Sequence, residues 1–92
     1  MKIVIVDDDC LVTEALKTIL EVNEDVQVLA TGSDGRDAVC LYAEYKPDVL
    51  LMDIRMKNMN GLEASAEILK ADAKANICLL YTSPSPRDYA AS

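Results

Sequence analysis

The side chains of this 92-residue chain that could do chemistry are carboxylates. The run Asp7-Asp8-Asp9 follows a short apolar segment near the N-terminus, and Asp53 ends another apolar segment. The chain has no histidine, so the commonest general base and metal ligand is absent from it. Its three cysteines form no Cys-x-x-Cys pair, and we interpret them as reduced thiols. Any chemistry in this sequence therefore rests on acids.

The composition indicates one folded domain and argues against several kinds of partner. Sixteen acidic and nine basic residues give a net charge of −7, and 51% of the residues are hydrophobic. A chain of this length cannot form two independent cores. The negative charge argues against direct binding of nucleic acid or of an anionic membrane. No apolar run approaches the roughly 18 residues of a membrane span and no secretory signal is recognisable, so we expect a cytoplasmic location.

Seven segments that could position the acids alternate between two hydrophobic patterns. Short runs rich in Ile, Val and Leu are typical of strands buried on both faces, and they cover Lys2–Val6, Val26–Ala30, Val49–Met52 and Ile77–Leu80. Longer segments repeat apolar residues at helical spacing, and they cover Cys10–Val22, Arg36–Tyr45 and Leu62–Ala71. The alternation predicts an α/β fold with a parallel sheet and right-handed crossovers.

The helical spacing also predicts which helix residues face the core. The apolar set of the first helix is Leu11, Val12, Ala15, Leu16, Ile19 and Leu20. Thr13 falls on the opposite face, which we expect to be in solvent. In the third helix Leu62, Ile68 and Leu69 are expected to face inward. Either Asp8 or Asp9 is expected to cap the first helix.

The acids converge if the strands have one particular order. In a parallel sheet, the carboxyl ends of the first and third strands lie at the same edge, which brings Asp7, Asp8 and Asp53 to that edge. If the first strand lies between the second and the third, the strand order is 2-1-3-4. The winding direction then reverses between strands one and three, where open α/β sheets bind ligands.

Three carboxylates in one pocket repel one another. Two unit charges about 4 Å apart cost about 4 kcal/mol at an effective dielectric constant near 20. Either some of the acids are protonated, or a cation lies among them. Each acidic motif alone could be a helix cap or a turn residue. Their conjunction favours a site, and an all-oxygen donor set favours Mg²⁺ over Zn²⁺.

Two sequence motifs carry a family resemblance. Val-Asp-Asp-Asp follows the first strand, and Val-Leu-Leu-Met-Asp-Ile-Arg-Met precedes the Asn-Gly pair at positions 60–61. Together they resemble the receiver domain of bacterial two-component response regulators. The run Met-Asp-Ile-Arg-Met is most similar to the branch with a LuxR-type helix-turn-helix output domain. The resemblance covers residues 1–77 and implies a flavodoxin-like three-layer sandwich with sheet order 2-1-3-4.

The resemblance also implies roles for individual residues. Asp53 would be the phosphoacceptor, and Asp7 and Asp8 would hold Mg²⁺ together with Asp53 and the main-chain carbonyl of Arg55. A sensor histidine kinase would donate the phosphoryl group from its phosphohistidine. The module would be a signalling switch and not an enzyme. It would control a DNA-binding output domain, and the full-length parent could form receiver homodimers.

The chain departs from the family pattern in several places. Lys57 stands where a proline is usual. The switch Thr or Ser would fall near Tyr81 and Thr82, so no switch residue is assigned, and the family's lysine has no counterpart. We expect a receiver truncated before its fourth helix and fifth strand. The string from Cys78 to Asp88 looks like a translated sequencing adapter, so we assign residues 1–77 to a partial receiver and 78–92 to a non-native tail.

Two other functions fit parts of the sequence. A Mg²⁺-dependent phosphatase of the haloacid-dehalogenase type carries Asp-x-Asp after its first strand, which Asp7-x-Asp9 could imitate. The chain is far too short for the remaining motifs of that class. A pseudo-receiver that binds partners without phosphorylation is the other alternative.

Overall fold

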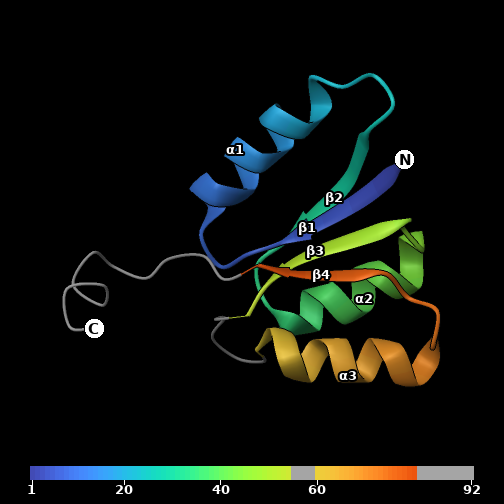
Figure 1. The fold of residues 1–92 in the computed structure, drawn as a ribbon. Helices are drawn as coiled ribbons and strands as arrows, with labels where there is room; N and C mark the ends of the chain where they lie inside the picture. Colours follow the sequence, from blue (N-terminus) through green and yellow to red (C-terminus); the bar gives the residue numbers. More distant parts are fainter. Residues whose placement is uncertain (55–59, 81–92) are drawn as a thin grey trace, which may run out of the picture.

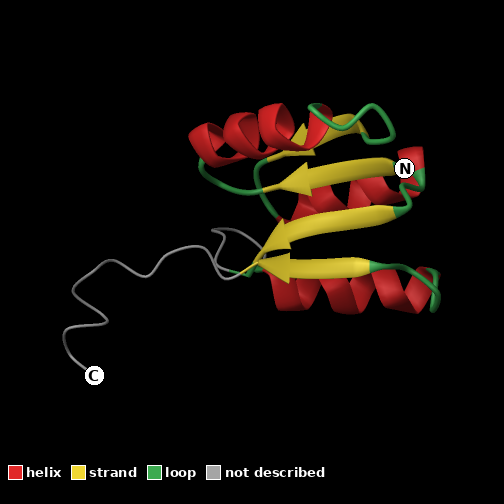
Figure 2. Ribbon diagram, turned by 45° about the horizontal axis from the view of Figure 1, so that its top comes forward, coloured by secondary structure: helices red, strands yellow, loops and turns green. Residues whose placement is uncertain are grey.

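The sheet has the predicted order. The computed structural model describes residues 1–54 and 60–80. The elements in these residues are β1 (Lys2–Val6), α1 (Cys10–Glu21), β2 (Gln27–Gly32), α2 (Gly35–Tyr45), β3 (Val49–Asp53), α3 (Gly61–Ala71) and β4 (Ile77–Leu80). The four strands form one parallel sheet in the order β2-β1-β3-β4. Their arrowheads point to the same rim in Figure 2.

Helices cover both faces of this sheet. Helix α1 lies on one face, over β1 and β2, whereas α2 and α3 lie side by side on the other (Figure 1). The arrangement confirms the predicted three-layer sandwich and α/β class. Among the described helices the longest has 12 residues, and none has the length and apolar character that crossing a membrane requires.

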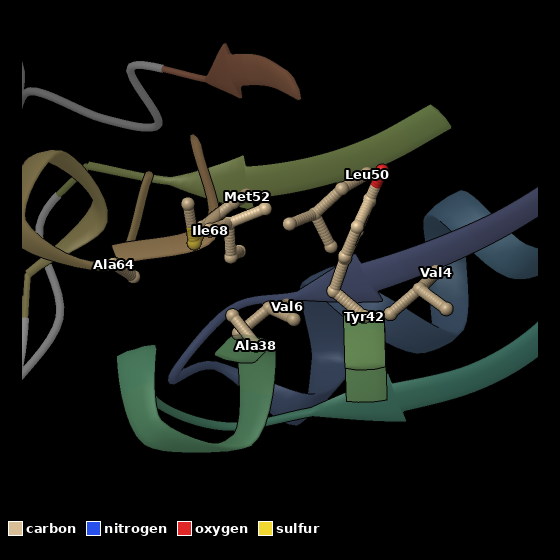
Figure 3. Close-up of a cluster of buried hydrophobic side chains, with 8 residues drawn as sticks. All are labelled: Val4, Val6, Ala38, Tyr42, Leu50, Met52, Ala64 and Ile68. Carbon is tan, nitrogen blue, oxygen red and sulfur yellow. The ribbon is translucent and has the colours of Figure 1, made fainter. Parts of the chain in front are cut away.

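The core has two parts because strand side chains alternate between the faces of the sheet. On the side of α2 and α3, four strand residues pack against four helix residues (Figure 3): Val4, Val6, Leu50 and Met52 against Ala38, Tyr42, Ala64 and Ile68. On the side of α1, buried strand residues pack against half-buried helix residues: Ile3, Ile5 and Val28 against Leu16 and Leu20. In the central strands β1 and β3, apolar burial on both faces explains the continuous apolar runs of the sequence, whereas the edge strands β2 and β4 are less buried than such runs predict.

The predicted inward face of α1 is partly wrong. Leu11 and Ile19 are 76% and 66% exposed, whereas Thr13 is buried. The Thr13 hydroxyl donates a hydrogen bond to the carbonyl of Cys10, which satisfies its polar group inside the fold. Helix α1 faces the sheet with the stripe Thr13, Leu16 and Leu20, so its apolar arc is wider than the surface that β1 and β2 offer.

The predicted inward face of α3 is also partly wrong. Leu62 and Leu69 are 56% and 42% exposed, and Ile68 is buried as predicted. The other buried positions of α3 are Gly61, at the start of the helix, and Ala64, one turn before Ile68. A small residue there leaves room for the neighbouring helix α2.

Each helix begins at a polar cap. The N-caps of α1, α2 and α3 are Asp9, Asp34 and Asn60. The capping residue of α1 is therefore Asp9 and not Asp8. Strand β2 runs two residues beyond its predicted end because Thr31 and Gly32 pair with the end of β1. Three residues of the segment predicted to be a non-native tail, 78–80, belong to β4 and pair with β3.

Candidate functional site

The first two acids of the site stand at the ends of neighbouring strands. Val6 and Met52 are register partners of the parallel pair β1–β3, so Asp7 and Asp53 come next at the same rim. The Asp7 amide donates a 3.1 Å hydrogen bond to the carbonyl of Gly32, which holds it against β2. The side chains of Asp7 and Asp53 are buried, and each residue is 3% exposed.

The third acid completes a compact cluster. Asp8 follows Asp7 directly and is exposed. One carboxylate oxygen from each of Asp7, Asp8 and Asp53 lies within 4.8 Å of the others. The structure therefore brings together three of the predicted site residues. Asp53 is 45 positions away from Asp8 in the sequence. Asp9 accepts a hydrogen bond from the amide of Leu11, and its carboxylate serves the cap of α1.

The environment of Asp7 favours its neutral form. Burial raises the pKa of this carboxyl above its usual range, and the nearby carboxylates of Asp53 and Asp8 raise it further. A 2.9 Å hydrogen bond from the amide of Asp9 to Asp7 Oδ1 opposes this shift. Asp7 Oδ2 is buried and has no hydrogen-bond partner among the described residues. A buried polar atom without a partner destabilises the fold, so binding of a proton or a cation to this oxygen would be favourable.

The donor set fits a hard divalent cation. It offers oxygen ligands only, and two of its three carboxylates are buried. Asp7 Oδ2, which has no partner within residues 1–54 and 60–80, offers a ligand atom, and a cation there would also reduce repulsion among the acids. The site can therefore hold a cation such as Mg²⁺ beside the carboxylate that ends β3.

Several predicted site positions cannot be placed in this geometry. Arg55, Lys57, Tyr81 and Thr82 lie outside the described residues. The proposed metal ligand at the carbonyl of Arg55 and the position of a switch residue therefore stay predictions.

One contact at the site was not predicted. Gly61, the first residue of α3, packs directly against the main chain of Asp53 and Ile54. The sequence showed only that an Asn-Gly pair ends a turn before a helix, and such a pair is common where no site exists. The contact depends on where α3 returns to the sheet, which local sequence does not specify.

Comparison with known proteins gives a consistent result. A family model described as "Response regulator receiver domain" matches residues 3–91. The transcriptional regulatory protein DegU of Brevibacillus brevis is 40% identical over 80 residues, which are 87% of this chain and 34% of that protein. The chemotaxis protein CheY of Listeria monocytogenes is 38% identical over 79 residues, which are 86% of this chain and 66% of that protein.

Solved structures agree with the sequence matches. A LuxR-family two-component response regulator from Aurantimonas sp. SI85-9A1 superposes with a TM-score of 0.85 at 28% identity, over 97% of this chain and 64% of that one. The response regulator domain of Thermotoga maritima CheB gives a TM-score of 0.84 at 34% identity, over 94% of this chain and 63% of that one. The chain spans about a third of the length of regulators such as DegU.

Proposed function

The chain belongs to the response regulator receiver domain family, and from this premise we propose that it is the phosphoacceptor module of a two-component phosphorelay. A sensor histidine kinase would supply the phosphoryl group, and Asp53 would accept it in the presence of Mg²⁺. The observation that carries the proposal is the acidic cluster: Asp53 ends a central strand beside Asp7, whose buried Oδ2 has no partner among the described residues.

The transfer itself needs little covalent chemistry from the protein. A carboxylate oxygen of Asp53 forms a bond to phosphorus while the P–N bond of the donor phosphohistidine breaks, and the electron pair of that bond stays on the imidazole nitrogen. Strand β3 is paired on both sides, which holds the main chain of Asp53 in place for in-line attack.

The neighbouring acids would prepare the site for a charged donor. Asp7, Asp8 and Asp53 would hold Mg²⁺, whose positive charge would offset the negative charge of the transferred phosphoryl oxygens. Two hydrogen bonds to the main chain hold Asp7. Its amide donates to the carbonyl of Gly32, and its Oδ1 accepts from the amide of Asp9. Its carboxylate is thereby oriented before any ligand arrives.

The names of the relatives support a proposal for the role of the parent protein. DegU is named as a transcriptional regulatory protein, and the regulator from Aurantimonas sp. SI85-9A1 is described as a member of the LuxR family. We therefore propose that phosphorylation of this module controls a LuxR-type DNA-binding output domain in a cytoplasmic parent, with receiver homodimers as one form of that parent. The module itself is proposed to act as a switch without turnover of a substrate.

The phosphatase alternative is weakened by the position of Asp9. A haloacid-dehalogenase site would need both acids of Asp7-x-Asp9 at the reacting group. The Asp9 carboxylate instead caps α1 through the amide of Leu11. A pseudo-receiver would have the same fold and acids, and only a phosphorylation experiment separates it from our proposal.

Labelling with a small phosphodonor tests the proposal. Acetyl phosphate and Mg²⁺ should add one phosphoryl group to the chain, detected by intact mass, and Asp53→Asn should abolish the addition. Asp48→Asn is the matched control because Asp48 lies before the same strand at the opposite rim and is exposed. Addition to Asp53→Asn, or addition to the wild type without divalent metal, would contradict the proposal.

A further inference from the structure

The main chain that follows Asp53 is held from two sides. The amide of Ile54 donates a 3.1 Å hydrogen bond to the carbonyl of Leu80, at the end of β4. The carbonyl of Ile54 accepts a 2.9 Å hydrogen bond from the amide of Gly61, the first residue of α3. The position of the peptide next to Asp53 therefore depends on β4 and on the start of α3.

Gly61 also lies so close to the main chain that any other residue would force these atoms apart. A Cβ atom at this position would lie 2.5 Å from the carbonyl oxygen of Asp53 and 2.9 Å from the Cα of Ile54. Both are main-chain atoms, so they cannot rotate away as a flexible side chain can. The φ angle of Gly61 is not positive. The requirement for glycine here is therefore one of space and not of left-handed conformation.

The start of α3 is itself fixed. Asn60, the N-cap, accepts a 2.8 Å hydrogen bond from the amide of Glu63 through its side-chain oxygen. One and two turns further along the helix, Ala64 and Ile68 are buried in the core. Because its helix is both capped and packed in the core, Gly61 has a fixed position beside the end of β3.

We propose that Gly61 is a positioning residue for the phosphoacceptor site. Its close contact and its hydrogen bond set where the main chain of Asp53 and Ile54 lies. This inference rests on the proposed function, because it assigns Gly61 to the same acidic cluster. Gly61 would act through the main chain of Asp53 and Ile54, whose atoms it contacts.

A single methyl group should disturb the cluster. Ordinary van der Waals contact begins at 3.4 Å, so an alanine would push the carbonyl of Asp53 away by up to about 0.9 Å. The carboxylates of Asp53, Asp7 and Asp8 have oxygens within 4.8 Å of one another, and a shift of that size changes their spacing appreciably. Disturbing the groups that orient metal ligands typically weakens metal binding by about 10- to 100-fold.

The experiment compares Gly61→Ala with Ile68→Val in the 92-residue chain. Ile68→Val removes one buried methylene group from the same helix, two turns away from Gly61, so we expect it to lower the melting temperature and to leave Asp53 in place. Mg²⁺ affinity is measured by isothermal titration calorimetry with no phosphodonor present. We expect Gly61→Ala to weaken Mg²⁺ binding by about tenfold or more, and Ile68→Val to leave the affinity within about twofold of the wild type.

Two results would overturn the inference. One is wild-type Mg²⁺ affinity in Gly61→Ala, and the other is an equal loss of affinity in both variants, which would mean that Gly61 acts only through stability. If Gly61→Ala does not fold, Asn60→Ala takes its place, because it loosens the start of α3 without adding an atom beside Asp53. An affinity of Asn60→Ala equal to that of Ile68→Val would then overturn the inference.

The design separates this inference from the proposed function. A wild-type chain that binds Mg²⁺ but takes no phosphoryl group from acetyl phosphate would refute the proposed function, while the calorimetric comparison would still decide the role of Gly61. A wild-type chain that binds no Mg²⁺ would overturn both.

Discussion

At the scale of single residues, Asp7 is the most informative member of the acidic cluster. It is almost fully buried, it lies beside two other carboxylates, and its Oδ2 has no hydrogen-bond partner among the described residues. Without a cation, its negative charge opposes folding, because burial and like charges both disfavour the ionised form. In our proposal, the Asp7 carboxylate therefore lowers the stability of the metal-free protein and supplies a ligand atom when the cation binds.

Replacing this charge should stabilise the metal-free protein. In Asp7→Asn the amide oxygen can still accept from the amide of Asp9, and the amide nitrogen can donate toward the remaining carboxylates. We expect the free energy of unfolding at neutral pH without divalent metal to rise by about 1–2 kcal/mol. Urea denaturation followed by far-UV circular dichroism measures it. The exposed Glu24→Gln is the control, and a loss of stability in Asp7→Asn would contradict our view of this site.

The same residue predicts the sign of a pH dependence. The pKa of Asp7 is raised above its ordinary value of 3.8 in the folded state, so the folded chain holds this proton more tightly than the unfolded chain. The corresponding stability is fully present below pH 3.8 and is lost as the pH rises through the folded pKa. The stability difference between Asp7→Asn and the wild type should therefore grow with rising pH in metal-free urea titrations. A difference that is constant from pH 3.5 to 7, or that shrinks, would be inconsistent with this shift.

At the scale of secondary-structure elements, the strands follow the sequence more closely than the helix faces do. Lys2–Val6 is buried on both faces from its second residue on, whereas Ile77–Leu80 is an edge strand without a fully buried residue, and both apolar runs have the predicted bounds. A helix has an apolar arc, and only packing decides which part of the arc is covered. Leu11 and Leu62 belong to such arcs and lie in solvent, because the sheet and α2 cover neighbouring parts of α1 and α3.

Two adjacent residues of α3 provide a direct test of that distinction. Ile68 is 2% exposed in the core and Leu69 is 42% exposed. Ile68→Ala should lower the free energy of unfolding by about 2–5 kcal/mol because it removes buried methyl groups and leaves a cavity. Leu69→Ala, the matched control on the same turn, should cost less than about 1 kcal/mol. Equal costs in urea denaturation would show that α3 presents a different face to the core.

At the scale of the whole molecule, the sequence predicted the architecture and the acids but not how tightly they are held. The alternating pattern, with acids after the first and third strands, was sufficient to bring Asp7, Asp8 and Asp53 to one rim. The burial of Asp7 Oδ2 without a partner in the described part of the chain could not be predicted, and neither could the contact of Gly61 with Asp53, because both depend on tertiary distances of a few ångströms. The ligand proposed at the carbonyl of Arg55 rests on the family resemblance alone.

Metal binding should be visible as a change in the stability of the molecule. A ligand that binds only the folded state at about 100 times its Kd adds about 2.7 kcal/mol to the free energy of unfolding. For a domain of this size, Mg²⁺ at that concentration should raise the melting temperature by roughly 10–20 °C. NaCl at matched ionic strength is the control, and Asp7→Asn should abolish most of the increase. A similar increase with NaCl, or in Asp7→Asn, would indicate general screening and no specific site.

The most direct test of the central claim is chemical mapping of the phosphorylated residue. Sodium borohydride reduces an aspartyl phosphate to homoserine, so the modified position can be read by peptide sequencing in a mass spectrometer. After incubation with acetyl phosphate and Mg²⁺, our account predicts homoserine at position 53 and at no other position. Homoserine at position 7 instead would indicate a nucleophile after β1, as in the phosphatase alternative, and would contradict the assignment of Asp53.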